Sequence, residues 1–511
     1  MVNKKLTINN LQLTISSIVF LFILTIGYFI SRIINLTTIP VFCDEAIYIR
    51  WAQVMRAEPS LRFLPLSDGK QPLFMWLMIP FLKVIKDPLA AGRMVSVFSG
   101  FGTMVGVFAL SYLLFKKIRL SFLASILYLI SPFSLFFDRM ALVDGLLSFL
   151  GIWFLIFSVW LVNGVRLDLA MIGGIILGLG LITKSPALFF AILLPTTLIT
   201  FNFKRKDLPL HLIKVVGLWL VVWVFGFAIY NILRLGPEFH MISIRNKDYV
   251  FSFSEVLKHP LTPFLGNSRK TFDWFWVWLT PPIFVLGIFG IYLSLKKNFN
   301  KGALLLTWFL LPLIGQGAIA KVYTARYILF SVPLFLIFAA FIMERIFSLF
   351  KNKVIGVIGL VLVLLLPCYQ IFLLISNPAE AWLPVQERKG YLEEWTAGYG
   401  IKEAALYLKK VAQNQKVLVG TEGFFGTLPD GLQIYLEKIP NITVVGVGYP
   451  IKEIPDKLTN ALQDNKVFLL VNDSRFEVKE TQNLKFISKY PKAENPKTGI
   501  RENLLFFEIL K

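Results

Sequence analysis

The chain has 511 residues, of which 56% are hydrophobic and only 16% are charged, well below the roughly 25% that is usual in soluble globular domains. This composition excludes an ordinary soluble protein over most of the chain and indicates a membrane protein. The formal net charge is +21, but most Lys and Arg residues lie in short loops between apolar runs and no nucleic-acid-binding signature is present. We therefore expect no nucleic-acid partner.

Long apolar segments follow one another up to residue 376. A helix needs about 20 apolar residues to cross a bilayer, and about eleven segments are long enough. We place them at 13–35, 92–115, 120–137, 144–163, 169–184, 187–203, 212–233, 274–296, 302–320, 327–347 and 353–376. The shorter apolar stretch 72–82 predicts a partly submerged or re-entrant helix.

Clusters of Lys and Arg occur in alternate short loops between these segments. Cytoplasmic loops are enriched in such residues, so the pattern predicts a multi-pass plasma-membrane protein with a cytoplasmic N-terminus. An odd number of crossings then places everything after residue 376 outside the cytoplasm. The basic residues behind this orientation are Lys4, Lys5, Lys116, Lys117, Arg119, Arg166, Lys204, Arg205, Lys206, Lys214, Lys296, Lys297, Lys301, Arg345, Lys351 and Lys353.

The last part of the chain differs in composition from the rest. Residues 377–511 have an ordinary soluble composition, which predicts a separate domain after a transmembrane domain at 1–376. Helical periodicity alternates there with strand patterns, as in a small α/β domain. The helices are expected at 401–411 and 428–436, and the strands at 416–420, 442–447, 466–471 and 504–510. The predicted fold is an α-helical polytopic membrane protein with a C-terminal soluble α/β domain.

Ionisable residues concentrate in the long loop 36–91, where Asp44 and Glu45 directly follow the first span. Carboxylates at that depth are costly unless they are used or paired. Consecutive helical residues point about 100° apart, so the two cannot face one small target. One acting as a base, with the other held in an ion pair, fits this geometry. The spacing fits equally well an N-terminal helix cap.

Several cations and a carboxylate lie at the same side of other spans. Lys70 stands before Gln71-Pro72, at the entry of the submerged helix, where an ammonium can meet a lipid phosphate or merely reach bulk headgroups. Cations are disfavoured in short outer loops, so those at span ends need a local reason. A bound anion or an acidic partner would supply that reason. The residues of interest at these span ends are the cations Arg93, Lys184 and Arg326, the carboxylate Asp144, and Tyr327 beside Arg326.

The order of these motifs resembles the GT-C membrane glycosyltransferases, over residues 1 to about 350. The elements are the Asp-Glu pair at 44–45, Lys-Gln-Pro-Leu at 70–73, Ala-Gly-Arg at 91–93, Met-Ala-Leu-Val-Asp at 140–144, Gly-Leu-Ile-Thr-Lys-Ser-Pro at 180–186 and Tyr-Thr-Ala-Arg-Tyr-Ile-Leu at 323–329. The branch it resembles is glycosyltransferase family 39, which includes protein O-mannosyltransferases and lipid A aminoarabinose transferases. Gln71 departs from the pattern, because many members have a second proline there.

The resemblance implies transfer, with inversion, of mannose or another hexose or pentose from a polyprenyl-phosphate donor. The acceptor would be a hydroxyl of a lipid, glycan or protein on the extracytoplasmic face. Asp44 would be the base and Glu45 its structural neighbour, while Lys70 would hold the donor phosphate. Looser candidates for the same task are Arg93, Lys184 and Arg326.

Asp144 matches an acidic position of unassigned role. Members of this branch generally work without a catalytic metal, so no metal or other cofactor is expected. The principal alternative is a transporter or flippase of a lipid-linked saccharide. Such proteins place charges near mid-membrane and often contain repeats, whereas the charges here gather at one interface.

Overall fold

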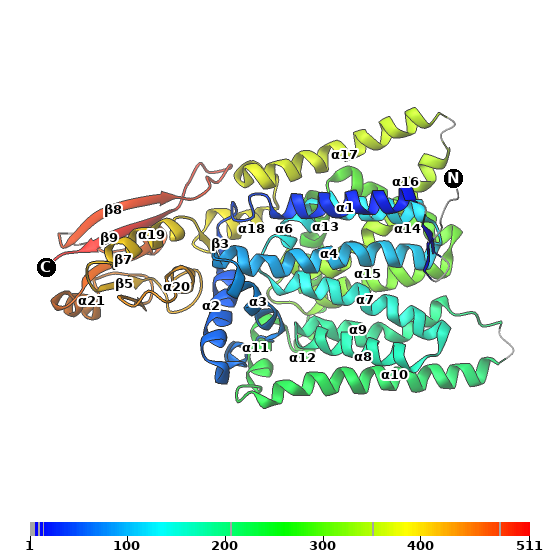
Figure 1. The fold of residues 1–511 in the computed structure, drawn as a ribbon, viewed down its shortest axis with the longest axis horizontal. Coiled ribbons are helices and arrows are strands. Elements are labelled where there is room, and N and C mark those ends of the chain that lie inside the picture. The colour runs from blue at the N-terminus through cyan, green and yellow to red at the C-terminus, as the bar shows by residue number, and fades with distance from the viewer. Residues whose placement is uncertain (1–5, 9–10, 14, 205–206, 350–351, 480–481) are drawn as a thin grey trace.

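The computed structural model describes residues 6–8, 11–13, 15–204, 207–349, 352–479 and 482–511. Of the basic residues used to orient the chain, Lys4, Lys5, Arg205, Lys206 and Lys351 lie outside the described residues. A bundle of long helices forms most of the molecule, and a five-stranded sheet stands at one end of it (Figure 1). The chain is a multi-pass membrane protein with a C-terminal α/β domain.

Seven helices of the described chain are long and apolar enough to cross a bilayer. Two of them are largely buried by their neighbours, α7 and the segment that ends with α16, whereas α1, α10 and α17 leave most of their surface uncovered. An apolar helix that its own protein leaves uncovered must be covered by lipid. The seven are α1 (Ile15–Ile33), α4 (Pro88–Phe115), α7 (Val143–Gly164), α10 (Leu208–Tyr230), α15 (Phe299–Ile319), α16 (Val332–Leu349) and α17 (Lys353–Ser376).

Two further helix pairs are apolar enough but sharply bent, which gives nine candidate spans in the described chain if each pair counts as one, against about eleven expected. Helices α5 (Ile118–Leu129) and α6 (Pro132–Asp138) meet at 60°, and α13 (Leu261–Trp278) and α14 (Pro281–Lys297) meet at 116°. A proline begins the second helix of each pair, and proline cannot continue a preceding helix. The expected spans at 169–184 and 187–203 are shorter apolar helices, α8 (Leu167–Leu181) and Ser185–Thr200.

The loop at 36–91 is mostly helical and lies at the end of the bundle nearest the sheet (Figure 1). Helix α2 (Cys43–Ala57) packs on α3 (Leu73–Val84), and α11 (Met241–Tyr249) from the loop 234–273 contacts the 3-10 turn Leu64–Asp68 between them. The apolar stretch predicted as a short helix at 72–82 is therefore a helix.

The C-terminal sheet has the order β6-β5-β7-β9-β8. Strands β5 (Val417–Thr421), β6 (Ile442–Gly446) and β7 (Lys466–Asn472) are parallel, and β9 (Asn503–Ile509) and β8 (Leu484–Pro491) complete the sheet antiparallel. Helices α19 (Ile401–Val411) and α20 (Asp430–Leu436) lie where the periodicity predicts them. Strand β8 was not predicted, because Lys485, Ser488 and Lys489 interrupt its apolar residues and so leave no apolar run in the sequence.

The helical bundle and the C-terminal domain share one apolar core. Strand β3 (Val41–Phe42), directly before α2, pairs with β4 (Ala397–Gly398). The ring of Phe42 lies 4.4 Å from that of Tyr391, and the ring of Trp51 lies 5.8 Å from that of Phe425. Helix α2 also packs against α20. Contacts from both parts of the molecule therefore fix the position of α2.

Candidate active site

The second carboxylate of the Asp-Glu pair is held inside the protein. Both oxygens of Glu45 accept from the guanidinium of Arg93, at 2.8 and 2.7 Å, and both side chains are fully buried. The same carboxylate accepts the backbone N–H of Phe42 at 3.0 Å and of Ala141 at 2.6 Å. A carboxylate with all its acceptor positions used serves to fix the start of α2.

Arg93 has no donor left for another ligand. Its remaining hydrogen bonds go to the backbone carbonyls of Leu36, Ile39 and Pro40, at 2.7 to 3.1 Å. A guanidinium has five N–H donors, and all five are used in this arrangement. Arg93, expected among the substrate-binding residues, is buried in this structure and ties the end of the first span to α2.

The first carboxylate of the pair points the other way, into a cavity of about 210 Å³. An oxygen of Asp44 lies 2.5 Å from the guanidinium of Arg326, and the Asp44 side chain is 27% exposed. Burial alone would raise the pKa of Asp44, but the cations of Arg326 and Lys70 outweigh it and hold that pKa below its ordinary value. Tyr48, one turn after Asp44, lines the same cavity. Asp44 is therefore ionised and accessible.

A second ion pair lies at the wall of this cavity. The ammonium of Lys184 is 2.6 Å from an oxygen of Asp144 and 3.9 Å from the centre of the Tyr327 ring. Burial lowers the pKa of Lys184 to about 8, although Asp144 counteracts the shift. The other oxygen of Asp144 is buried and has no partner among the described residues. Lys184 thus retains its charge at neutral pH while its solvation is reduced.

Lys70 completes the set of cations, held by a residue from a distant loop. Its ammonium donates to the hydroxyl of Tyr249 at 2.7 Å and lies 4.1 Å from the centre of that ring. Gly69, just before it, has a φ of +67°, and a Cβ there would lie 2.8 Å from that of Arg245. Arg245 in turn pairs with Asp68 at 2.8 Å. Only glycine fits this turn without strain.

A larger cavity of about 480 Å³ adjoins the first and shares with it Lys70, Lys184, Tyr249 and Tyr327. Apart from these shared residues its lining is mainly apolar. Leu188, Ile192 and Ile319 are among the apolar side chains, and they are 38 to 61% exposed. A polar cavity with three cations therefore continues into an apolar groove at the side of the bundle.

A segment after the last span supports Arg326. The buried carboxylate of Glu387 accepts the backbone N–H of Ala325 at 2.8 Å. The Arg326 guanidinium lies 5.6 Å from the centre of the Phe42 ring, which itself contacts Tyr391. The position of Arg326 opposite Asp44 therefore depends on residues from the region 385–393.

No family model matches the chain, and no curated protein matches it in sequence. Solved structures do match it. ArnT from Cupriavidus metallidurans in the apo state is 14% identical, with a TM-score of 0.58 over 96% of this chain and 97% of that chain. The structure of the same protein bound to undecaprenyl phosphate is 13% identical, with a TM-score of 0.56 over the same shares of the two chains. The archaeal oligosaccharyltransferase AglB from Archaeoglobus fulgidus, in complex with an inhibitory peptide and a dolichol-phosphate, is 12% identical, with a TM-score of 0.51 over 89% of this chain and 70% of that chain.

The chain has the GT-C fold. Most of the site residues expected from the sequence lie around the 210 Å³ cavity, whereas Glu45 and Arg93 lie apart from it. Those around the cavity are Asp44, Lys70, Asp144, Lys184, Arg326 and Tyr327. No group of three or more His, Cys, Asp and Glu side chains in the described parts of the chain is placed to hold a metal ion.

Sequence reasoning missed two contributors to the site. Tyr249 comes from the loop 234–273, and a single tyrosine in a polar stretch gives no signal of its own. Glu387 lies beyond the last span, in a segment assigned to the soluble domain. Its position beside residue 325 follows from the way the chain returns to the bundle, which no local pattern encodes.

Proposed function

We propose that the chain is a membrane glycosyltransferase that moves a sugar from a polyprenyl-phosphate donor to an acceptor hydroxyl, with inversion at the anomeric carbon. The observation that carries the proposal is the continuity of the two cavities. One contains an ionised carboxylate and three cations, and the other is an apolar groove at the side of the bundle. A phosphate carrying both a sugar and a long lipid needs this combination.

Asp44 is proposed as the base. Its lowered pKa keeps it ionised at neutral pH, so it can take the proton of the acceptor hydroxyl as that oxygen bonds to the anomeric carbon. The bond from that carbon to the phosphate oxygen breaks, and its electron pair stays on the phosphate. Fixed cations beside the departing phosphate stabilise the charge that develops there. Lys70, Lys184 and Arg326 are proposed for this role, with Tyr327 beside them.

The remaining site residues are proposed to position these groups. Asp144 would hold the ammonium of Lys184, since the two lie 2.6 Å apart. Glu45 and Arg93 would fix the start of α2 and thereby the direction in which Asp44 points. The ion pair between Asp44 and Arg326 would open when the donor phosphate attracts the guanidinium, which frees the carboxylate for the acceptor.

The structural neighbours support a lipid-linked donor, because ArnT has been seen with undecaprenyl phosphate and AglB with a dolichol-phosphate. We propose mannose or another hexose or pentose as the sugar, and a lipid, glycan or protein as the acceptor. We further propose a plasma-membrane enzyme divided into a transmembrane domain at 1–376 and a domain at 377–511. Its N-terminus would be cytoplasmic, and the cavity and the C-terminal domain extracytoplasmic.

The test is a transfer assay on the full chain in membrane vesicles, with undecaprenyl phosphate carrying tritiated mannose and, in parallel, a tritiated pentose. Asp44→Asn should lower the rate of sugar release from the donor by about 10²- to 10⁴-fold, as loss of a general base does. Asp168→Asn is the matched control, because Asp168 pairs with Arg166 on the surface at the far end of α8. Equal rates for wild type and Asp44→Asn would refute the assignment, and movement of intact donor across the vesicle would favour a flippase.

A further inference from the structure

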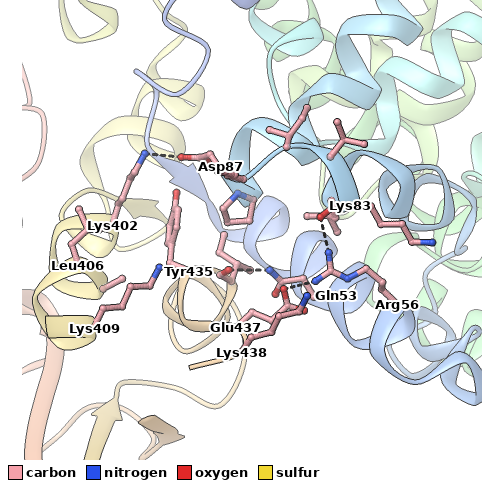
Figure 2. A pocket seen from close by; sticks show the side chains of 17 residues that line it. Gln53, Arg56, Lys83, Asp87, Lys402, Leu406, Lys409, Tyr435, Glu437 and Lys438 are labelled. Carbon is pink, nitrogen blue, oxygen red and sulfur yellow. Dashed lines mark hydrogen bonds and ion pairs between the residues drawn. The ribbon is translucent and has the colours of Figure 1, made fainter. Parts of the chain in front are cut away.

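A third cavity, of about 410 Å³, lies between the bundle and the C-terminal domain, and the proposed transfer reaction does not use it. Its wall combines residues of α2, the turn between α3 and α4, α19, and the end of α20 (Figure 2). Gln53 of α2 lies nine residues after Asp44. At about 100° per residue the two point to opposite sides of the helix, so this cavity is separate from the one that contains Asp44.

The charge of this cavity is strongly positive. Six basic side chains and two carboxylates line it, which gives a formal charge of +4. The two carboxylates are already paired, Glu437 with Arg56 at 2.5 Å and Asp87 with Lys402 at 2.6 Å. These pairs stand at two sides of the cavity in Figure 2. The excess positive charge therefore belongs to other lysines.

Those lysines have no acidic partner in the described structure. Lys86, Lys409 and Lys438 line the cavity and form no ion pair among the residues that the structure describes. Lys409 extends toward Tyr435, whereas the remaining lysine, Lys83, points away from the others (Figure 2). Like charges held near one another repel, so a site that keeps them in place suits a ligand with more than one negative charge.

Neutral side chains also line the cavity. The side chain of Gln53 is 2% exposed, and its amide nitrogen donates to the carbonyl of Ile434 at 2.9 Å. Its amide oxygen is enclosed by the protein, so Gln53 ties α2 to α20 at the edge of the cavity and offers the ligand no accessible acceptor. The ring of Tyr435 and the side chain of Leu406 give the cavity an apolar surface beside it.

We infer that this cavity is a binding site for a phosphorylated saccharide. The phosphate would be held by lysines from both sides, Lys86 from the bundle and Lys409 and Lys438 from the C-terminal domain. The sugar ring would lie against Tyr435. The volume is within the range of small-molecule sites. A ligand bound there would link the bundle to the C-terminal domain. This inference does not depend on the proposed transfer reaction.

The phosphorylated saccharide has two sources, a soluble sugar phosphate and the headgroup of a membrane lipid. The experiment measures binding to the purified full chain at low salt in two arms. The first arm titrates glucose 6-phosphate into protein in detergent and measures binding by calorimetry. The other uses protein in phosphatidylcholine nanodiscs with and without phosphatidylinositol 4-phosphate, read out by exchange of a fluorescent derivative of that lipid.

The double variant Lys409→Gln/Lys438→Gln should weaken binding about 100-fold, about tenfold for each lost charge-assisted hydrogen bond. Lys452→Gln/Lys457→Gln removes two exposed lysines of the same domain that lie away from the cavity, and should bind as wild type does. Lys86→Gln, from the bundle side, should cost about tenfold by the same reasoning.

Loss of glucose 6-phosphate binding in the cavity variants alone would support the site with a soluble ligand. Loss confined to the lipid arm would support it with a headgroup. Absence of binding in both arms, or equal weakening by the cavity pair and the control pair, would overturn the inference. Elution of each variant as wild type does on size-exclusion chromatography establishes that it folds.

Discussion

Replacing Arg93 by methionine should destabilise the protein strongly, although Arg93 does not line the candidate active site. The guanidinium donates two hydrogen bonds to Glu45 and three to carbonyls of the segment 36–40, and both side chains of the ion pair are fully buried. Removing one partner of a buried ion pair costs about 3–5 kcal/mol, because the other charge stays uncompensated. The carbonyls that lose their donor add to this cost, so we expect at least about 4 kcal/mol.

The measurement is thermal unfolding of the detergent-purified chain, followed by the fluorescence of its 12 Trp residues. Glu45→Gln keeps the shape of the side chain, but its single amide oxygen can accept from only one of the two backbone amides, which reach different carboxylate oxygens. Three carbonyls still surround the unpaired Arg93 charge, so its loss should be about 3 kcal/mol, smaller than that of Arg93→Met. Asp44→Asn breaks a partly exposed pair, which contributes less than a buried one. The expected order of melting temperature is Arg93→Met lowest, then Glu45→Gln, then Asp44→Asn close to wild type.

Activity should follow a different order. Asp44→Asn should abolish sugar transfer while it melts like the wild type, and Glu45→Gln should retain transfer at temperatures where it stays folded. A variant Arg93→Met that melted like the wild type, yet bound the donor more weakly, would refute the reasoning. Arg93 would then contact the substrate, as the sequence motif alone suggests.

Three further outcomes follow from the site. Transfer should fall as pH rises through about 8, because the buried ammonium of Lys184, whose pKa is lowered to about 8, loses its proton there; Lys184→Arg should move that fall to higher pH. Glu387→Leu should raise the KM for the donor more than it lowers kcat, because the loop at Ala325 loses its acceptor, and Glu387→Gln should restore much of the affinity. Gly69→Ala should weaken donor binding by about tenfold or more, since strained backbone costs about 1–3 kcal/mol and the new methyl would meet Arg245; an unchanged donor affinity would contradict this.

Local patterns predicted the elements of the C-terminal domain well where the sequence has a clear apolar pattern. The helix at 401–411 has the predicted bounds, and strands β5, β6, β7 and β9 lie within a residue of their predicted ends. All four are runs of mostly apolar residues in the sequence. Strand β8 instead places Lys485, Ser488 and Lys489 among its apolar residues, so its composition gave no strand signal.

The spans were harder to count than to locate. An apolar window measures composition and carries no information on direction, so a helix bent at Pro132 or Pro281 looks like a straight one. The bends of 60° and 116° therefore had no counterpart in the sequence analysis. The apolar helices at 167–181 and 185–200, which were expected to span, are shorter than the other candidate spans.

The site was predictable to the extent that its geometry is helical. Asp44 and Glu45 occupy consecutive positions on one helix, so their side chains are expected to point in different directions. In the structure Asp44 faces the cavity and Glu45 is buried against Arg93. Which cation meets which carboxylate is decided by tertiary packing. Arg93 and Arg326 are both basic residues near span ends, yet one is enclosed by carbonyls and the other faces the cavity.

The pairing of β3 with β4 has a consequence for any attempt to obtain a smaller active enzyme. A chain cut after residue 376 would lose the strand that holds Val41 and Phe42 just before α2. It would also lose Glu387, and it would bare the side of α2 that packs on α20. The region after residue 376 therefore completes the packing around α2, despite its soluble composition. We expect a shortened chain to aggregate rather than to act as a minimal catalyst.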